Sequence, residues 1–83
     1  MKKLSTIEAI QSIKENPNLL YQGYSRDEGK RDFYLFGRHW GGNLFLKMVG
    51  KKLNGDGFED CEAIPLHDGV YWIKNSEINK NIF

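Results

Sequence analysis

The sequence predicts an α+β fold in which an N-terminal amphipathic helix packs on a four- or five-stranded antiparallel sheet. Apolar residues recur at helical spacing before Pro17. After Pro17, short apolar runs alternate with glycine-rich turns, as in consecutive β-hairpins. The last nine residues, 75–83, place Ile78 and Ile82 four apart and predict a short C-terminal helix. At 83 residues, we expect a single domain spanning 1–83.

The N-terminal helix has defined start and stop signals. Ser5 is followed three residues later by Glu8, the spacing of a capping box, and Leu4 and Ala9 occupy the positions of a hydrophobic staple. Pro17 disfavours helical backbone at the residue before it, so the helix should end by residue 15 or 16.

One face of this helix should be apolar. Ile7, Ile10 and Ile13 recur every three residues, with polar residues between them. We therefore expect the three isoleucines to form a stripe that covers one face of the sheet.

Five segments are expected to be strands. The turn at 25–30 contains Gly29, and the segment 54–57 holds two dipeptides typical of hairpins, Asn-Gly and Asp-Gly. Pro65 should end the fourth strand. The strands are predicted at residues 19–24, 31–38, 43–49, 58–64 and 70–74.

The runs "DFYLF" and "VYWI" are apolar at successive positions, which indicates that both faces of the sheet bury side chains. Either the sheet curls into a small barrel or a second apolar face is left for a partner. We expect the barrel, because an open sheet leaves edges that need protection.

Composition and charge indicate an ordered protein with two oppositely charged segments. The sequence is 40% hydrophobic and 28% charged, which is too apolar for a disordered chain. Residues 26–52 carry seven basic and three acidic side chains, whereas residues 53–70 carry five acidic and no basic ones. If these segments form neighbouring strands, the charges pair across the sheet. If they face different ways, the molecule has one basic face.

The expected compartment is the cytoplasm. A lone cysteine, Cys61, cannot form an intramolecular disulfide, and small secreted domains usually contain several. The first residues lack the apolar stretch of a signal peptide, and no apolar run is long enough to cross a membrane. We therefore expect no membrane partner.

The sequence contains no set of residues that predicts catalysis, a metal site or a cofactor. Cys61, His39 and His67 lack the paired spacing of zinc ligands. Asp60 and Glu62 flank Cys61 and should raise the pKa of its thiol, which argues against a reactive thiolate. We therefore expect a non-enzymatic protein without a cofactor.

The candidate binding residues are Arg38, His39 and Trp40, at a glycine-flanked bend between two strands. Tryptophan and arginine contribute much of the binding energy at protein interfaces, so a larger protein is the expected partner. The alternative is a small β-domain that binds single-stranded nucleic acid, in which basic and aromatic residues alternate and Lys47, Lys51 and Lys52 extend the groove.

The segment "STIEAIQSIKENPNLLY", a capped helix leading directly into a strand, resembles the opening of many small bacteriophage proteins, among them the Thoeris anti-defence 2 group. The resemblance covers about a fifth of the chain, and it carries no functional residue across. Lysine, asparagine and isoleucine make up 23 of the 83 residues, the usage of an AT-rich genome. These features are compatible with an accessory protein of a phage or mobile element, or with an inhibitor of a host system.

Overall fold

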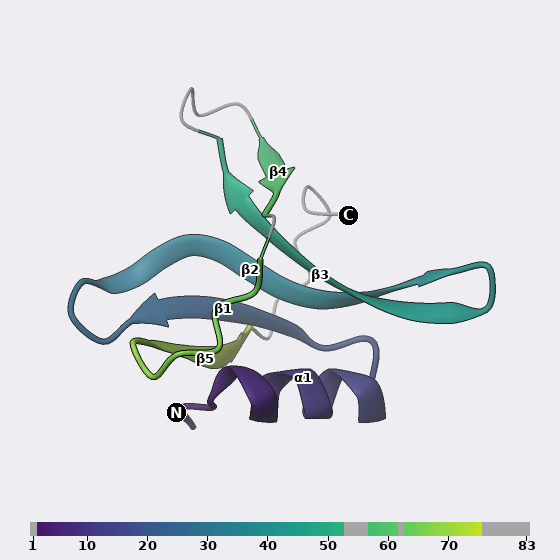
Figure 1. Ribbon diagram of the computed structural model, residues 1–83, viewed down its shortest axis with the longest axis horizontal. Coiled ribbons are helices and arrows are strands. Elements are labelled where there is room, and N and C mark those ends of the chain that lie inside the picture. Colours follow the sequence, from purple (N-terminus) through teal and green to yellow (C-terminus); the bar gives the residue numbers. More distant parts are fainter. Residues whose placement is uncertain (1, 53–56, 62, 76–83) are drawn as a thin grey trace.

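The computed structural model describes residues 2–52, 57–61 and 63–75, and only the backbone of residues 30–32. The predicted C-terminal helix lies outside the described residues, apart from Asn75, which ends a strand. The described residues form one helix and one antiparallel sheet (Figure 1). The predicted α+β class is therefore confirmed.

Helix α1 spans Thr6–Glu15 and begins at the predicted capping box. Ser5 Oγ accepts a hydrogen bond from the Glu8 amide at 3.1 Å, and Glu8 Oε1 accepts one from the Ser5 amide at 2.9 Å. Asn16 has extended backbone angles, as expected for a residue before Pro17. Both predicted ends of the helix are confirmed.

The sheet contains five strands: β1 (Leu20–Ser25), β2 (Gly29–Trp40), β3 (Asn43–Lys51), β4 (Phe58–Asp60) and β5 (Val70–Asn75). Their order in the sheet is β4-β3-β2-β1-β5. The first four strands are joined as consecutive hairpins, and β5 returns to pair with β1 on its other side. Strand β2 is longer than predicted, since it continues through His39 to Trp40, whereas β4 ends at Asp60 and not at residue 64.

The expected barrel is wrong, because the sheet is open. Within the described chain, β4 pairs only with β3 and β5 only with β1, so the two outer strands do not close on each other. A strand of three residues forms too short a ladder to close a barrel. The apolar residues therefore do not line the inside of a barrel. They form a separate buried cluster on each face of the open sheet.

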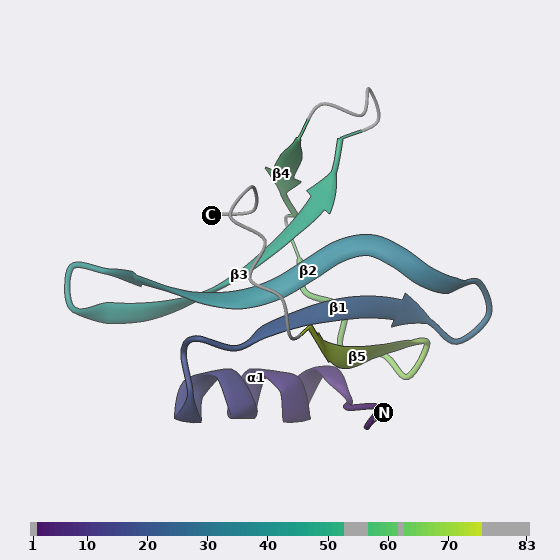
Figure 2. The same ribbon diagram turned by 180° about the vertical axis from the view of Figure 1, so that it is seen from behind.

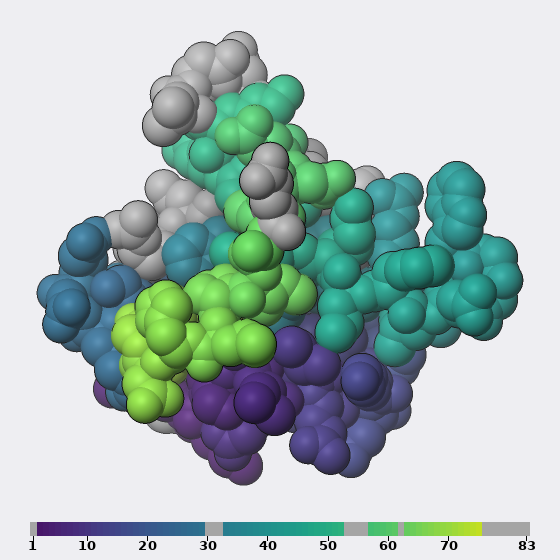
Figure 3. Space-filling view, viewed as in Figure 1, coloured from purple at the N-terminus to yellow at the C-terminus, as the bar shows by residue number. Residues whose placement is uncertain are grey.

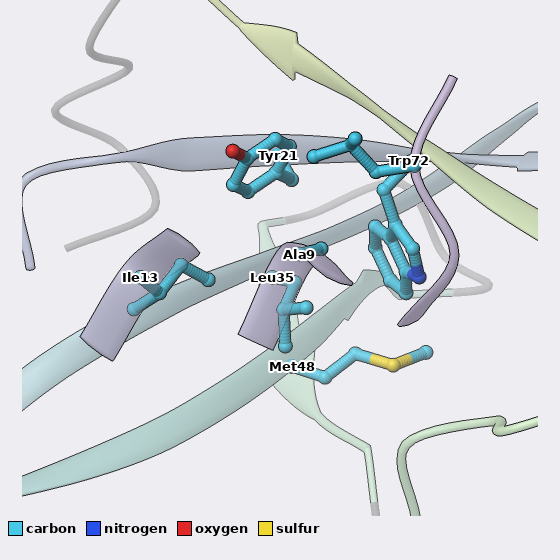
Figure 4. Close-up of a cluster of buried hydrophobic side chains, with 7 residues drawn as sticks. Ala9, Ile13, Tyr21, Leu35, Met48 and Trp72 are labelled. Carbon is cyan, nitrogen blue, oxygen red and sulfur yellow. The ribbon is translucent and has the colours of Figure 1, made fainter. Parts of the chain in front are cut away.

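The main core lies between α1 and the sheet and contains Ala9, Ile13, Tyr21, Leu35, Met48 and Trp72 (Figure 4), together with Leu4. A smaller cluster of Leu20, Phe36 and Val49 is buried on the other face. Leu35 and Phe36 are neighbours in sequence but belong to different clusters, as the alternation of a strand requires. We call the two faces of the sheet the helix face and the far face.

The predicted isoleucine stripe is only partly correct. Ile13 is fully buried and Ile10 packs at the margin of the core, but Ile7 is 62% exposed. The inner side of α1 is instead formed by Thr6, Ala9 and Ile13. Residues 6, 9 and 13 follow helical spacing, and residue 7 is turned by about 100° from residue 6. Because Thr6 hydrogen-bonds inside the core, it takes the position that the apolar pattern assigned to Ile7.

Strand β1 contains a bulge between Gln22 and Tyr24, where the register against β2 shifts. Gly23 lies at the bulge, and a Cβ atom there would lie 1.9 Å from the ring of Phe33. The missing side chain lets the Phe33 ring approach Trp72 edge-on, with ring centroids 5.4 Å apart.

Figures 1 and 2 show that the β2–β3 hairpin extends beyond the end of α1.

No helix in the described residues is long and apolar enough to cross a bilayer.

Candidate functional site

The end of the β2–β3 hairpin forms an arm, residues 37–46, that projects from the sheet (Figure 3). Its two strands are joined by the two-residue turn Gly41-Gly42, and Trp40 pairs with Asn43 across it. Both glycines have positive φ, 57° and 81°, as a type I′ hairpin turn requires. This turn sets the register of the arm and therefore which side chains lie opposite each other.

The arm begins where the helix stops contacting the sheet. A Cβ atom on Gly37 would lie 2.9 Å from the Ile13 methyl group and 3.5 Å from the Pro17 carbonyl oxygen. The end of α1 therefore rests directly on the Gly37 backbone. The next three residues of β2, Arg38, His39 and Trp40, are all exposed.

Strand alternation separates the three predicted binding residues. Arg38 and Trp40 follow Phe36 at even spacing, so they lie on the far face. His39 follows Leu35 and Gly37 at even spacing and lies on the helix face. The structure thus brings Arg38 and Trp40 together and places His39 on the opposite side of the arm.

Arg38 and Trp40 share a shallow groove of about 410 Å³ with Phe45, Leu46 and Lys47. Phe45 lies directly opposite Arg38 in the register, and Lys47 follows it on the same face. Trp40 is 72% exposed and Phe45 is 48% exposed, so two large apolar side chains face solvent side by side. We call the four residues Arg38, Trp40, Phe45 and Lys47 the arm face.

The electrostatics of the arm are basic. No aspartate or glutamate occurs in residues 33–55. Lys47 Nζ lies 3.0 Å from Asp60 Oδ2 on β4, so the basic and acidic segments pair here across neighbouring strands, as in the first of the two alternatives. Both groups are partly exposed, and such pairs contribute little to stability. Arg38 forms no ion pair with a carboxylate within the described residues, and its charge remains available to a ligand.

The other predicted binding residues are Lys51, which ends β3 far from the turn, and Lys52, which follows it. Both are exposed. Eight residues separate Lys51 from Asn43, a strand length of about 26 Å. These lysines therefore do not line the groove that contains Trp40.

Phe45 is the residue of the arm face that was not predicted from the sequence, whereas Lys47 was predicted as part of the groove of the nucleic-acid alternative. The information was present in the Gly41-Gly42 dipeptide, because a two-residue turn forces Trp40 opposite Asn43 and Arg38 opposite Phe45. The alternation along β3 then puts Lys47 on the same face as Phe45. The turn type therefore predicts Phe45 as a member of this face.

A second group of basic and aromatic residues on the far face is already engaged in contacts of its own. Tyr24 and Tyr71 stack with ring centroids 5.2 Å apart. Lys3 Nζ and the Arg26 guanidinium lie 4.8 and 5.4 Å from the Tyr71 centroid. These cation–π contacts tie the N-terminal segment and the β1–β2 turn to β5.

Among the described residues, the cysteine and the possible metal ligands can be compared with the side chains of the arm face. Partial burial, together with the charges of Glu59 and Asp60, raises the pKa of the Cys61 thiol, so the thiolate is disfavoured. In the part of the chain that the structure describes, no three histidine, cysteine or carboxylate side chains are grouped as metal ligands. The arm face offers the exposed rings of Trp40 and Phe45, the Arg38 guanidinium, which has no carboxylate partner among the described residues, and Lys47 paired with Asp60.

Comparisons with protein-family models, curated proteins and solved structures find no match to this chain.

Proposed function

We propose that this chain is a non-enzymatic binding protein that contacts a larger protein partner through the arm face. The observation that carries the proposal is the exposure of Trp40 and Phe45 beside Arg38 on a projecting hairpin. Large apolar side chains stabilise the monomer little when they face solvent, whereas their burial in a complex contributes about 25 cal/mol per Å². Tryptophan and arginine are also the residues that most often dominate interface energies.

The geometry of the hairpin also favours recognition. The turn and the cross-strand register hold the arm in one conformation, so little backbone entropy is lost on binding. The basic charge of the arm should attract a partner with an acidic surface. We propose further that the chain serves a phage or mobile element as an accessory protein or an inhibitor of a host system, in keeping with its composition.

The experiment is affinity capture from a host lysate with three forms of the protein. The wild type and His39→Ala should retain the same partner, because His39 lies on the opposite side of the arm. Trp40→Ala should lose the partner, since removal of a central aromatic side chain costs about 2 kcal/mol or more, roughly 30-fold in affinity. Equal capture by Trp40→Ala and His39→Ala, or recovery of nucleic acid alone, would contradict the proposal.

The second candidate function is binding of single-stranded nucleic acid. It is favoured by the adjacency of two exposed rings and the basic groups of Arg38 and Lys47, since bases stack on aromatic side chains in such grooves. It is disfavoured by the ion pair of Lys47 and by Glu59 and Asp60, whose carboxylates lie on the strand next to β3. We therefore rank it second.

A fluorescence-anisotropy titration with a single-stranded oligonucleotide tests this candidate. If Lys51 and Lys52 contact phosphates, binding should weaken by roughly 0.7 log units per contact for each tenfold rise in salt. The double variant Lys51→Ala/Lys52→Ala should then show a smaller slope. Absence of binding at low salt would exclude the nucleic-acid candidate, while leaving the protein-binding proposal standing.

A further inference from the structure

The outer edge of β3 along the arm carries backbone groups that pair with no strand among the described residues. Strand β4 pairs with β3 only from Val49 to Lys51. The Cys61 amide donates to the Met48 carbonyl at 2.9 Å and ends this ladder. Between Met48 and the turn, the edge of β3 that faces away from β2 pairs with no segment of the described chain.

The register shows which residues of this edge present their amides and carbonyls outward. The backbone of Met48 and Gly50 points toward β4, and these groups alternate along an antiparallel strand. Leu44 and Leu46 therefore point their N–H and C=O groups outward, whereas Asn43 and Phe45 bond to β2. An exposed edge of this kind is a template for another strand.

The two outer strands of the sheet are protected, which sets the arm apart. On β5, the Trp72 amide and carbonyl both exchange hydrogen bonds with Leu4, at 2.8 and 2.9 Å. Strand β4 has only three residues, two of which are the acidic Glu59 and Asp60. Short length and charge are the usual means of blocking an edge.

We propose that the occupant of this edge is a second copy of the chain, paired β3 to β3 about a two-fold axis at Phe45. An axis at Leu44 would pair Leu46 with Gly42 of the second copy, which is a turn residue and not a strand residue. An axis at Leu46 would pair Leu44 with Met48 of the second copy, whose carbonyl already accepts a hydrogen bond from Cys61. Centring on Phe45 pairs Leu44 of each copy with Leu46 of the other. Each such pair exchanges both of its backbone hydrogen bonds.

The side chains are compatible with this register. Phe45 meets Phe45 of the second copy across the axis and on the far face, which covers a ring that is 48% exposed in the monomer. Lys47 lies opposite Asn43, so no like charges face each other. Leu44 and Leu46 meet on the helix face, where both are half-buried in the monomer. The two sheets thus join into one continuous sheet with two arm faces side by side.

This inference goes beyond the proposed function and can be tested without a partner. Sedimentation equilibrium from micromolar to millimolar concentration should show a monomer–dimer equilibrium. Leu46→Pro removes an outward amide together with the leucine side chain, so it should raise the dimer dissociation constant by at least about tenfold and leave the circular dichroism spectrum unchanged. Leu46→Ala retains the amide and is the matched control.

A cysteine pair tests the register directly in a Cys61→Ser background. Phe45→Cys places two thiols in a non-hydrogen-bonded pair with Cα atoms about 4.5 Å apart, within disulfide range. Oxidation should then give a covalent dimer on a non-reducing gel. Lys47→Cys should not, because the two substituted positions lie about 13 Å apart along the strands. A monomer at all concentrations, or equal cross-linking of both variants, would overturn the proposal.

Discussion

The indole Nε1 of Trp72 donates a hydrogen bond to the Thr6 hydroxyl at 2.8 Å, and both side chains are buried. The same hydroxyl donates to the Pro65 carbonyl oxygen at 2.6 Å. One threonine thereby joins the start of α1, strand β5 and the segment that connects β4 to β5. Residues 63–69 cross the helix face of the sheet and lie beside α1 in Figure 3.

Thr6→Val should lower the free energy of unfolding by about 1–3 kcal/mol, because it leaves the buried Trp72 N–H without an acceptor while keeping the volume of the side chain. Thr6→Ser retains the hydroxyl and should cost less, close to the value of one methyl group, about 0.8 kcal/mol. Urea denaturation of both variants measures the difference. Equal losses would mean that the hydrogen bond contributes little to stability.

The position of the helix on the sheet predicts opposite outcomes for two isoleucines. Ile13→Ala should cost about 2–5 kcal/mol, because the side chain is fully buried against the sheet. Ile7→Ala should change stability by less than about 0.5 kcal/mol, since its side chain faces solvent. The urea midpoints of the two variants test this directly. A large loss of stability from Ile7→Ala would show that the face of α1 turned away from the sheet is also buried.

Gly23 and Phe33 should be energetically coupled. Gly23→Ala forces the new methyl group into the Phe33 ring and should cost about 1–3 kcal/mol. In a Phe33→Ala background the space is empty, so the same substitution should cost much less. A double-mutant cycle on unfolding free energies measures the coupling. Additive losses from the two substitutions would indicate that the bulge, and not the ring, restricts position 23.

The capping box predicts a specific pH dependence. Hydrogen bonds from Ser5 lower the pKa of the Glu8 carboxyl below its ordinary value of 4.5. Because the folded pKa is the lower one, the ionised carboxylate stabilises the fold above pH 4.5, and this contribution is lost as the pH falls through the folded pKa. The difference in melting temperature between wild type and Glu8→Gln should therefore shrink on acidification.

Glu15→Gln provides the control for this measurement. It removes the same charge from the last turn of α1, where a carboxylate is unfavourably placed in the helix dipole. Because this variant keeps Glu8, its melting temperature above pH 4.5 should not fall below that of the wild type, as the melting temperature of Glu8→Gln should. The same pH profile for both variants would assign the effect to net charge.

Local patterns in the sequence determined the helix boundaries and the alternation of the strands. Ser5, Glu8 and Pro17 act within one or two turns of the chain, so their effect needs no tertiary contact. Likewise, the Gly41-Gly42 turn determines the pairing of Arg38 with Phe45, because a two-residue loop allows one register. The arm face was therefore contained in the sequence, although Phe45 was not predicted from it.

Tertiary packing decided the features that depend on contacts between distant residues. The inward face of α1 contains Thr6 and not Ile7, because Trp72, far along the chain, requires a hydrogen-bond acceptor there. The open sheet follows from the shortness of β4 and from the pairing of β5 with β1. The opposite directions of Arg38 and His39 follow from alternation, but the exposure of His39 on the helix face follows from the end of α1 resting on Gly37. Apolar periodicity does not encode these contacts, since each one joins segments that are separated in the sequence.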